Sequence, residues 1–408
     1  MLPVTLFYSW QMDRPSDVCR TFIGKALDEA VTILADEGEI ALKIDSDTKD
    51  EPGTPPISET ILRKIRECDI FLGDMTFVAQ AGEKLIPNPN VMGEYGYALH
   101  AKGLRRILLV MNEAYGPAKE LPFDLHHLRH PERYTLAEDV GGGARRDARK
   151  ALGQRLAAYI KLIAKELAAE QVQTQTEIAK ALSDAWWTAV QQRPINNRPA
   201  LVSPPTALVH VMPAAALGDR YIGPHDVKPV HGLLRVDDDA EAIFGTGGQD
   251  WFAHSPKRLV TRGHNEEATW YGRLLQPGVV EYEVTVGELI DDDPAIVVKG
   301  KHLEWMIVTA ADRGLALAAA LNLQGPSLVG VVLYGLENVE LSGPYRTRKL
   351  GQPSLALPTA IIPPGVVHSG DHLRRAFDTL WMMAGFDDGS PSYAEDRWAG
   401  YDSGGRHG

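Results

Sequence analysis

The sequence predicts an α/β protein: a doubly wound parallel sheet over the first third of the chain, then a helical connector and an α+β domain. Strand-like and helix-like stretches alternate from the N-terminus to about residue 112. Right-handed crossovers between such elements give a parallel sheet with helices on both faces. Residues 70–72 and 107–111 are short apolar runs, which are typical of strands that are buried on both faces.

Hydrophobic periodicity predicts the elements of the first domain in order. The helix after the first strand carries apolar residues three and four positions apart, from Phe22 to Leu34, and Ser16 or Asp17 is a suitable N-cap for it. The predicted strands cover residues 3–9, 40–44, 70–72, 107–111 and 133–136, and the other helices cover residues 57–67, 91–102 and 144–169.

The helix after the third strand carries the most informative carboxylate, Glu94. The Pro-Asn-Pro turn at residues 87–89 disfavours helix before it, Asn90 is a good N-cap, and Gly103 is placed to end the helix. Glu94 is therefore expected just past the first turn, where the helix N-terminus favours the ionised carboxylate. This turn opens at the carboxyl edge of the sheet, where α/β proteins bind ligands.

Composition divides the 408 residues into four parts. The chain is too long for one ordinary core, and residues 194–205, rich in Pro, Asn and Arg, form the best boundary. In the second half, residues 259–262, 269–275, 279–286, 295–298 and 328–333 read as strands, and residues 302–313 and 372–384 as helices. We expect a first domain over 1–140, a helical connector over 141–195, an α+β sensor or assembly domain over 196–390 and a flexible tail over 391–408.

The composition also restricts the class of protein. A formal net charge of −12 argues against a protein that binds nucleic acid through phosphate contacts. No apolar run approaches the roughly 20 residues of a membrane helix, and the N-terminus has no basic region of a signal peptide. Two cysteines, Cys19 and Cys68, are too few for a disulfide framework. These features predict a cytoplasmic protein that binds a small ligand or a protein partner.

Polar side chains from four segments converge on one edge of the predicted sheet. Because the carboxyl ends of parallel strands share an edge, residues that follow the first three strands are expected to lie near the helix of Glu94. Sheet packing alone does not require polar groups there, so we predict a binding crevice. Its candidate residues are Ser9, Trp10, Gln11, Asp13 and Arg14 after the first strand, Asp45 and Asp47 after the second, Asp74 after the third, and Glu94.

Four motifs of residues 1–140 resemble bacterial TIR-like (Toll/interleukin-1 receptor-like) nucleotide-binding domains. They are FYSW near the N-terminus, PGTPPI before the second helix, CDIFLGDMT, and PNPNVMGEYGYAL followed by a strand. The pattern N-V-x-x-E-x-G-x-A-L is also similar to nucleoside 2-deoxyribosyltransferases. Both resemblances imply a flavodoxin-like sheet and an enzyme that breaks or exchanges the bond between a ribose and a base.

The resemblance implies that Glu94 is the catalytic residue of an NAD⁺ glycohydrolase that releases nicotinamide. A carboxylate beneath the ribose stabilises the oxocarbenium character of the transition state, or attacks C1′ in the transferase variant. NAD⁺ is then the substrate, and neither a cofactor nor a metal is required. The candidate substrate-binding residues are Tyr8, Ser9 and Trp10 on the pocket floor, with Trp10 stacking on a base, Arg14 on a phosphate, Asp45 and Asp74 on ribose hydroxyls, and Asn90.

The resemblance also implies regulation, because bacterial TIR-like domains usually sit beside a sensor and gain activity on self-association. We therefore expect a homo-oligomer or a partner that acts through the second half, as in an anti-phage defence effector that depletes NAD⁺ on demand. Two alternatives stay open: a nucleoside deoxyribosyltransferase or hydrolase that uses the same Glu94, and a non-catalytic nucleotide-binding signalling scaffold. The histidines at 126, 127 and 130 lack the further ligands of a metal site.

Overall fold

A computed structural model describes residues 1–46, 56–122, 131–192, 205–238, 240–248, 250–259, 266–289 and 296–400. The chain forms two compact units, Met1–Thr174 and Gln175–Gly408. Each unit is described by itself below. In the described part of the chain, no helix combines the length and the apolar character that crossing a bilayer requires.

The first unit is built on a five-stranded sheet in which all neighbouring strands are parallel. The strand order is β2-β1-β3-β6-β7, so the α/β prediction holds for this unit. The strands are β1 (Leu2–Ser9), β2 (Ile40–Asp45), β3 (Ile70–Asp74), β6 (Ile107–Asn112) and β7 (Glu132–Tyr134).

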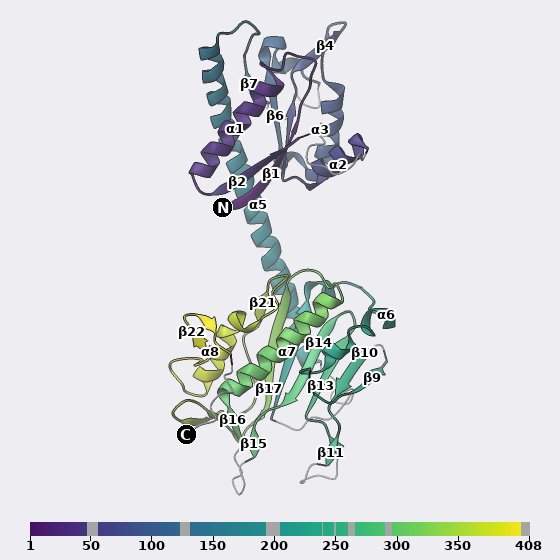
Figure 1. The fold of residues 1–408 in the computed structure, drawn as a ribbon, viewed down its shortest axis with the longest axis vertical. Helices are drawn as coiled ribbons and strands as arrows, with labels where there is room; N and C mark the ends of the chain where they lie inside the picture. Colours follow the sequence, from purple (N-terminus) through teal and green to yellow (C-terminus); the bar gives the residue numbers. More distant parts are fainter. Residues whose placement is uncertain are drawn as a thin grey trace. The chain divides into compact units, whose positions relative to one another are not determined.

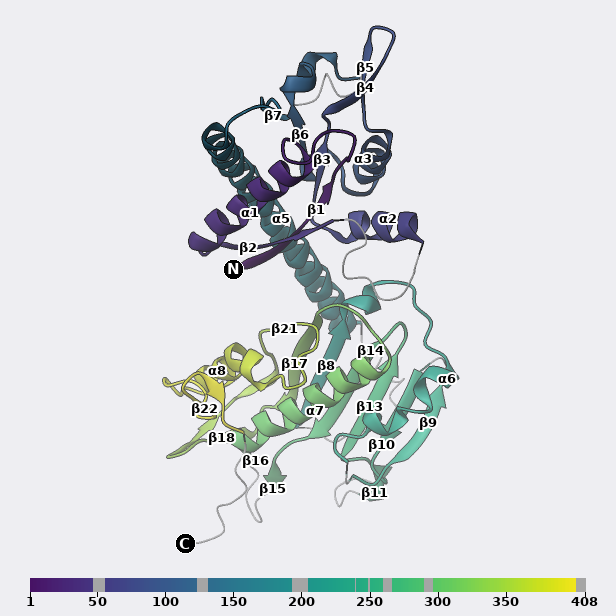
Figure 2. The ribbon, with the colours of Figure 1, turned by 45° about the horizontal axis from the view of Figure 1, so that its top comes forward.

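Helices cover both faces of this sheet (Figures 1 and 2). On one face, α1 (Arg20–Asp36) and the first half of α5 (Gly142–Gln191) pack with Val4, Leu6 and Tyr8 of β1. On the other face, α2 (Ile57–Glu67) and α3 (Pro89–Lys102) pack with Phe7. Successive residues of a strand point to opposite faces, so β1 divides its side chains between two cores.

Two predicted helix starts in this unit are wrong. α1 begins at Arg20, and its N-cap position is Cys19, whose side chain makes no capping hydrogen bond; neither Ser16 nor Asp17 is the cap. α3 begins at Pro89, and Asn88 is its N-cap, not Asn90. A proline in the first helical position has the backbone angle of a helix and lacks only an N–H that would have no partner there, which places the cap one residue before it. Gly103 ends α3 as expected, with a φ of 72°.

The sequence reading missed a hairpin between β3 and α3. The stretch between the predicted strand at 70–72 and the predicted helix at 91–102 was given no element, but it contains β4 (Phe77–Ala81) and β5 (Lys84–Pro87), which pair antiparallel. Short 3₁₀ segments lie elsewhere in the first unit, η1 at Leu104–Arg106, η2 at Glu113–Tyr115 and η3 at Ala118–Glu120.

Helix α5 belongs to both units. Gly142–Gln191 is one helix of 50 residues, which spans most of the predicted helical connector at 141–195. Leu152, Leu156 and Ile160 are buried in the core of the first unit, and Leu182 and Trp186 are buried in the second. The units meet at Thr174, inside the helix, and not at the predicted boundary of residues 194–205. Residues 193–204 lie outside the described part.

The second unit is built on an eight-stranded antiparallel sheet with the order β20-β17-β8-β14-β13-β10-β9, in which β21 also pairs with β17. Four further strands form a smaller sheet of order β15-β16-β18-β19. The strands are β8 (Thr206–Pro213), β9 (Ile243–Gly247), β10 (Asp250–His254), β11 (Arg258–Leu259), β12 (Glu266–Glu267), β13 (Trp270–Leu275), β14 (Val279–Thr285), β15 (Glu288–Leu289), β16 (Ile296–Lys299), β17 (Ser327–Leu336), β18 (Val339–Ser342), β19 (Thr347–Lys349), β20 (Gln352–Ala356) and β21 (Ala360–Ile362).

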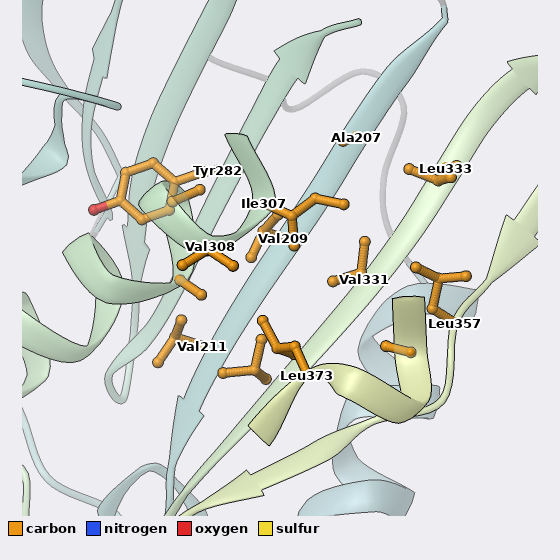
Figure 3. Packing of buried hydrophobic residues seen from close by; sticks show 14 of the residues in the cluster. Ala207, Val209, Val211, Tyr282, Ile307, Val308, Val331, Leu333, Leu357 and Leu373 are labelled. Carbon is orange, nitrogen blue, oxygen red and sulfur yellow. The ribbon is translucent and has the colours of Figure 1, made fainter. Parts of the chain in front are cut away.

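Helix α7 (Gly300–Ala320) packs on one face of the large sheet. Figure 3 shows the side chains of β8 and β17 directed toward Ile307 and Val308 of this helix. The helix extends seven residues past the predicted end at 313, because Leu315, Leu317 and Ala318 continue its buried face. The other helical segments are α6 (Pro224–Val227), α8 (Arg374–Met383), η5 (Ala214–Leu217), η6 (His231–Leu234) and η7 (Gly370–His372).

The opposite face of the sheet receives the end of α5. Trp186 lies over Gly330 of β17, where a Cβ atom would come within 2.2 Å of the indole nitrogen. The indole N–H donates to Nδ1 of His210 at 3.2 Å, and Nε2 of His210 lies 2.8 Å from Oε2 of Glu281. An indole nitrogen can only donate, so Nδ1 accepts and the proton of His210 lies on Nε2.

Part of the predicted tail is ordered into the second unit. β22 (Tyr393–Ala394) and β23 (Arg397–Trp398) form a hairpin, and the Trp398 ring lies 5.5 Å from that of Phe377 in α8. The prediction of a flexible tail is therefore wrong for residues 391–400, because the hairpin pairing and this aromatic contact hold the segment against α8. Residues 401–408 lie outside the described part of the chain.

Candidate functional site

The strand order predicts a crevice at the carboxyl ends of β1 and β3. These neighbouring strands lead to helices on opposite faces, since α1 packs in one core and α3 in the other. Connections that leave a sheet in opposite directions open a gap between them, and α/β sheets bind ligands in such gaps. Ser9 ends β1 and Asp74 ends β3, so both residues lie where the crevice is expected.

Glu94 and Ser9 meet at this edge. The Ser9 hydroxyl donates to Oε2 of Glu94 at 2.5 Å, across 85 residues of sequence. Ser9 is 2% exposed, and Glu94 is half-buried. Ser9 points to the face of α3 because it is two residues from Phe7, which packs in the core of α3. The structure therefore brings the predicted catalytic residue together with a predicted binding residue.

Burial raises the pKa of Glu94 above its usual value, and the hydrogen bond from Ser9 lowers it by less. The helix N-terminus, which was expected to favour the ionised form, does not offset this effect of burial. Glu94 is the sixth residue of α3, and the side chain of Asn88 already accepts from the N–H groups of Asn90 and Val91. The helix dipole acts mainly within the first turn, so desolvation decides the ionisation of this carboxyl.

The side chain of Tyr8 does not share a face of the sheet with that of Ser9. It points to the opposite face of β1, is 4% exposed, and donates its hydroxyl to the Arg20 carbonyl at 3.3 Å. Strand alternation prevents adjacent residues from lining one floor, so this part of the prediction is wrong. Trp10 is half-buried, and one face of its ring is covered by the Arg20 guanidinium, 3.4 Å from the ring centre.

Asp74 is fully buried and has its hydrogen bonds within the protein. Its Oδ1 accepts from the N–H of Thr76 at 3.0 Å and from the Thr76 hydroxyl at 2.5 Å, and its Oδ2 accepts from Nε2 of Gln11 at 3.3 Å. Burial raises the pKa of Asp74. Since the side chain has no exposed surface, the predicted contact of Asp74 with a ribose hydroxyl is wrong for this conformation.

Arg14 presents a fixed guanidinium at the same edge. Its Nε donates to the Phe77 carbonyl at 2.8 Å, and its Cζ lies 4.3 Å from the ring centre of Tyr115. Its terminal Nη nitrogens make no hydrogen bond to the described residues. A guanidinium held by its Nε and one face keeps these nitrogens for an anion. The geometry is compatible with the predicted phosphate contact.

Asn88 links α3 to the loop after β1, a contact that the sequence reading missed. Besides capping α3, it donates from Nδ2 to Oδ2 of Asp13 at 2.6 Å. Proline in position 89 was the signal for this cap. The side chain of Asn90 is exposed and makes no hydrogen bond to the described residues, whereas its backbone N–H donates to Asn88.

Asp45 is not joined to the other candidates. It ends β2 and pairs with Lys64 of α2, with 2.9 Å between Oδ1 and Nζ. Among the described residues, no hydrogen bond connects it to Ser9, Arg14 or Glu94. Asp47 and the histidines at 126, 127 and 130 lie outside the described residues, in which no cluster of three or more potential metal ligands occurs.

A hollow of about 420 Å³ lies at the other end of β6. It is lined by the start of this strand, residues 107–109, and by Tyr95, Tyr159 and Leu162 among others. Asn112, at the far end of β6, belongs to the carboxyl edge, and neither Glu94 nor the loop after β1 lines the hollow. The hollow and the candidate site are therefore separate.

Neither a protein-family model nor a curated protein sequence matches this chain. The resemblance of residues 1–140 to TIR-like domains and deoxyribosyltransferases therefore stays a prediction.

Proposed function

We propose that the first unit cleaves the N-glycosidic bond between ribose and nicotinamide in NAD⁺, with Glu94 as the catalytic carboxylate. The observation that carries this proposal is the hydrogen bond between Ser9 and Glu94 at the end of β1. It holds a half-buried carboxylate beside the point where the strand order reverses. The order β2-β1-β3-β6-β7 corresponds to the order 2-1-3-4-5 of flavodoxin-like sheets, and we propose a flavodoxin-like, TIR-like fold.

The carboxylate matches the charge that develops in this reaction. Departure of nicotinamide neutralises its ring nitrogen and leaves positive charge on the ribose, and a fixed anion stabilises this charge more in the transition state than in the ground state. The cationic nicotinamide ring of the bound substrate also favours the ionised form of Glu94, which opposes the effect of burial. Ser9 fixes the orientation of the carboxyl group.

The remaining residues supply binding. The Nη nitrogens of Arg14, which make no hydrogen bond to any described residue, suit the diphosphate of NAD⁺. Trp10, which is half-buried and packs beside the core of α1, is the candidate for stacking on a base. We extend the proposal to a regulated effector in which the second unit acts as a sensor or assembly domain, through a second copy or a partner.

The test supplies NAD⁺ and deoxynucleosides side by side to the wild-type protein, to Glu94→Gln and to Glu59→Gln. Glu59 is an exposed glutamate in the first turn of α2, so its variant controls for the loss of one helical carboxylate. Release of nicotinamide by the wild type and Glu59→Gln, with a loss of at least about 100-fold in Glu94→Gln, is expected. Release of free base from the deoxynucleoside instead would identify the transferase or nucleoside hydrolase.

Cellular NAD⁺ separates an enzyme that needs an activator from a scaffold. The wild type and Glu94→Gln are expressed at equal levels, and NAD⁺ is measured with cell viability. An NAD⁺ level that falls only with the wild type supports the glycohydrolase. Toxicity that is the same for both proteins, with NAD⁺ unchanged, would support a non-catalytic scaffold.

A further inference from the structure

A chain of hydrogen bonds runs from the core of the sheet to the loop that carries Arg14. The backbone N–H of Asn112, the last residue of β6, donates to the Thr76 hydroxyl at 3.0 Å, and this hydroxyl donates to Oδ1 of Asp74 at 2.5 Å. Gln11 donates from Nε2 to Oδ2 of Asp74 at 3.3 Å, and its Oε1 accepts from the N–H of Arg14 at 2.9 Å. The carboxylate of Asp74 is thus joined to the backbone of the loop through one side chain.

The hydrogen bonds fix the orientation of the Gln11 amide. The N–H of Arg14 is a donor, so the amide oxygen must face it, and the amide nitrogen then faces Asp74. Gln11 is 1% exposed, so water does not offer its amide an alternative partner. The side chain at position 74 must therefore accept a hydrogen bond from Gln11 with one atom and hydrogen bonds from Thr76 with the other. An ionised carboxylate meets both requirements, whereas an asparagine meets only one.

We infer that Asp74 is a positioning residue, which holds the loop between β1 and α1 through Gln11 and so places Arg14 for the reaction. Its catalytic consequence rests on the proposed function, but the positioning of the loop does not. A substrate-binding aspartate must be reached by the substrate, whereas Asp74 holds the loop through Gln11 while it is fully buried. A residue that binds substrate directly needs its own carboxylate, whereas a positioning carboxylate can be moved to another residue of the same chain of hydrogen bonds.

Asp74→Asn places an amide nitrogen against the amide nitrogen of Gln11. If the Gln11 amide rotates so that its oxygen accepts from the amide introduced at position 74, its nitrogen faces the N–H of Arg14. Two donors then face each other at that position instead. Gln11→Glu alone places two carboxylates against each other. In the double variant Asp74→Asn/Gln11→Glu, the amide introduced at position 74 accepts from Thr76 and donates to the carboxylate introduced at position 11. That carboxylate also accepts from the N–H of Arg14, so every donor again has an acceptor, in side chains of nearly the same shape.

Hydrogen exchange of the Arg14 amide tests the positioning without any substrate. It is measured in the full-length protein by mass spectrometry, resolved to single residues by fragmentation. We expect protection in the wild type, exchange at least about tenfold faster in each single variant, and recovered protection in the double variant. Asp139→Asn, in an exposed position, is the matched control and should exchange like the wild type.

Two results would overturn the inference: wild-type protection in Asp74→Asn, or fast exchange that persists in a folded double variant. Thermal unfolding and circular dichroism show whether each variant is folded, and Gln11→Ala replaces any single variant that is not. Nicotinamide release is then measured with the same proteins. A loss of about 100-fold in Asp74→Asn that the double variant restores supports placement for catalysis, and a loss that it does not restore assigns the Asp74 carboxylate a direct role instead. If the wild type releases no nicotinamide, the proposed function fails while the exchange data still decide the positioning.

Discussion

The buried amide of Asn112 ties three segments to the end of β6, and Asn112→Asp tests how much they depend on it. Its Oδ1 accepts from the N–H groups of Ala114 and Leu136, at 3.1 and 3.0 Å. Its Nδ2 donates to the carbonyls of Val18 and Leu136, at 3.2 and 2.9 Å. The residue has no exposed surface. An ionised aspartate would direct a negative oxygen at two carbonyl oxygens, so the folded state must take up a proton.

The loss in the free energy of unfolding depends on the difference between the pH and the pKa of the aspartate in the unfolded state. An aspartate that stays protonated in the folded state and has the usual pKa of about 3.9 when unfolded destabilises the protein by about 4 kcal/mol at pH 7. The folded pKa is then raised above the unfolded one, so stability is highest below the unfolded pKa and falls by about 1.4 kcal/mol per pH unit as the pH rises. The lost second donor adds about 1 kcal/mol at every pH.

Thermal unfolding of the full-length protein between pH 4 and 8 measures this dependence. The two costs together are about 5 kcal/mol at pH 7, and about 1 kcal/mol corresponds to roughly 2–4 °C for a unit of this size. The transition of the first unit should therefore fall by roughly 10–20 °C at pH 7 and by far less at pH 4. Asn90→Asp is the control, because this side chain is exposed. A deficit in Asn112→Asp that does not change with pH would refute the argument that the carboxyl group must be protonated.

Three further predictions concern other contacts. Ser9→Ala removes the hydrogen bond that lowers the pKa of Glu94, so the acid limb of the pH–activity profile should move to higher pH, with about tenfold or greater loss of activity below it. Gly330→Ala brings a Cβ against Trp186 and should destabilise the second unit by about 1–3 kcal/mol in thermal unfolding. Burial raises the pKa of Glu304, so the contribution of this residue to stability falls as the pH rises through its folded pKa. Glu304→Gln should therefore unfold at a higher temperature than the wild type at pH 7 and at the same temperature at pH 4.

Each of these predictions has a result that would contradict it. An unchanged acid limb in Ser9→Ala would mean that the hydroxyl does not control Glu94. Gly232→Ala is the control for Gly330→Ala, because nothing lies within 4 Å of a Cβ there, and equal melting temperatures of the two variants would argue against the close approach of α5. A Glu304→Gln variant less stable than the wild type at pH 7 would show that the hydrogen bonds of this carboxylate outweigh its burial.

The elements with strong local signals were predicted well. Residues 57–67 were predicted as a helix, and α2 has the same bounds. β3 and β6 start where their apolar runs start, because a strand buried on both faces needs an uninterrupted apolar segment. β2 also starts where it was predicted, and its burial alternates as in an edge strand. The hairpin of β4 and β5 was missed because its burial falls from Phe77 to mostly exposed residues, and such short strands depend on pairing rather than on composition.

The site was predicted in location but not in detail. The sequence indicated that the loop after β1, the end of β3 and the helix of Glu94 would share one edge. It did not show that Tyr8 points into the opposite core. Which side chains of a strand point to which core is known only when the helices on each face of the sheet are known. Nor did it show that Asp74 is buried under Gln11, since both residues look equally polar in the sequence.

By itself, the sequence of this protein determined the alternation of strands and helices in the first unit and the helix that carries Glu94, because periodicity, prolines and glycines act over a few residues. Only the tertiary structure decided that Ser9 donates a hydrogen bond to Glu94, that Asp74 is buried and accepts from Gln11 and Thr76, and that α5 contributes to two cores. These outcomes depend on which segments the topology brings together, and hydrogen bonds between residues 63 to 85 positions apart leave no local pattern.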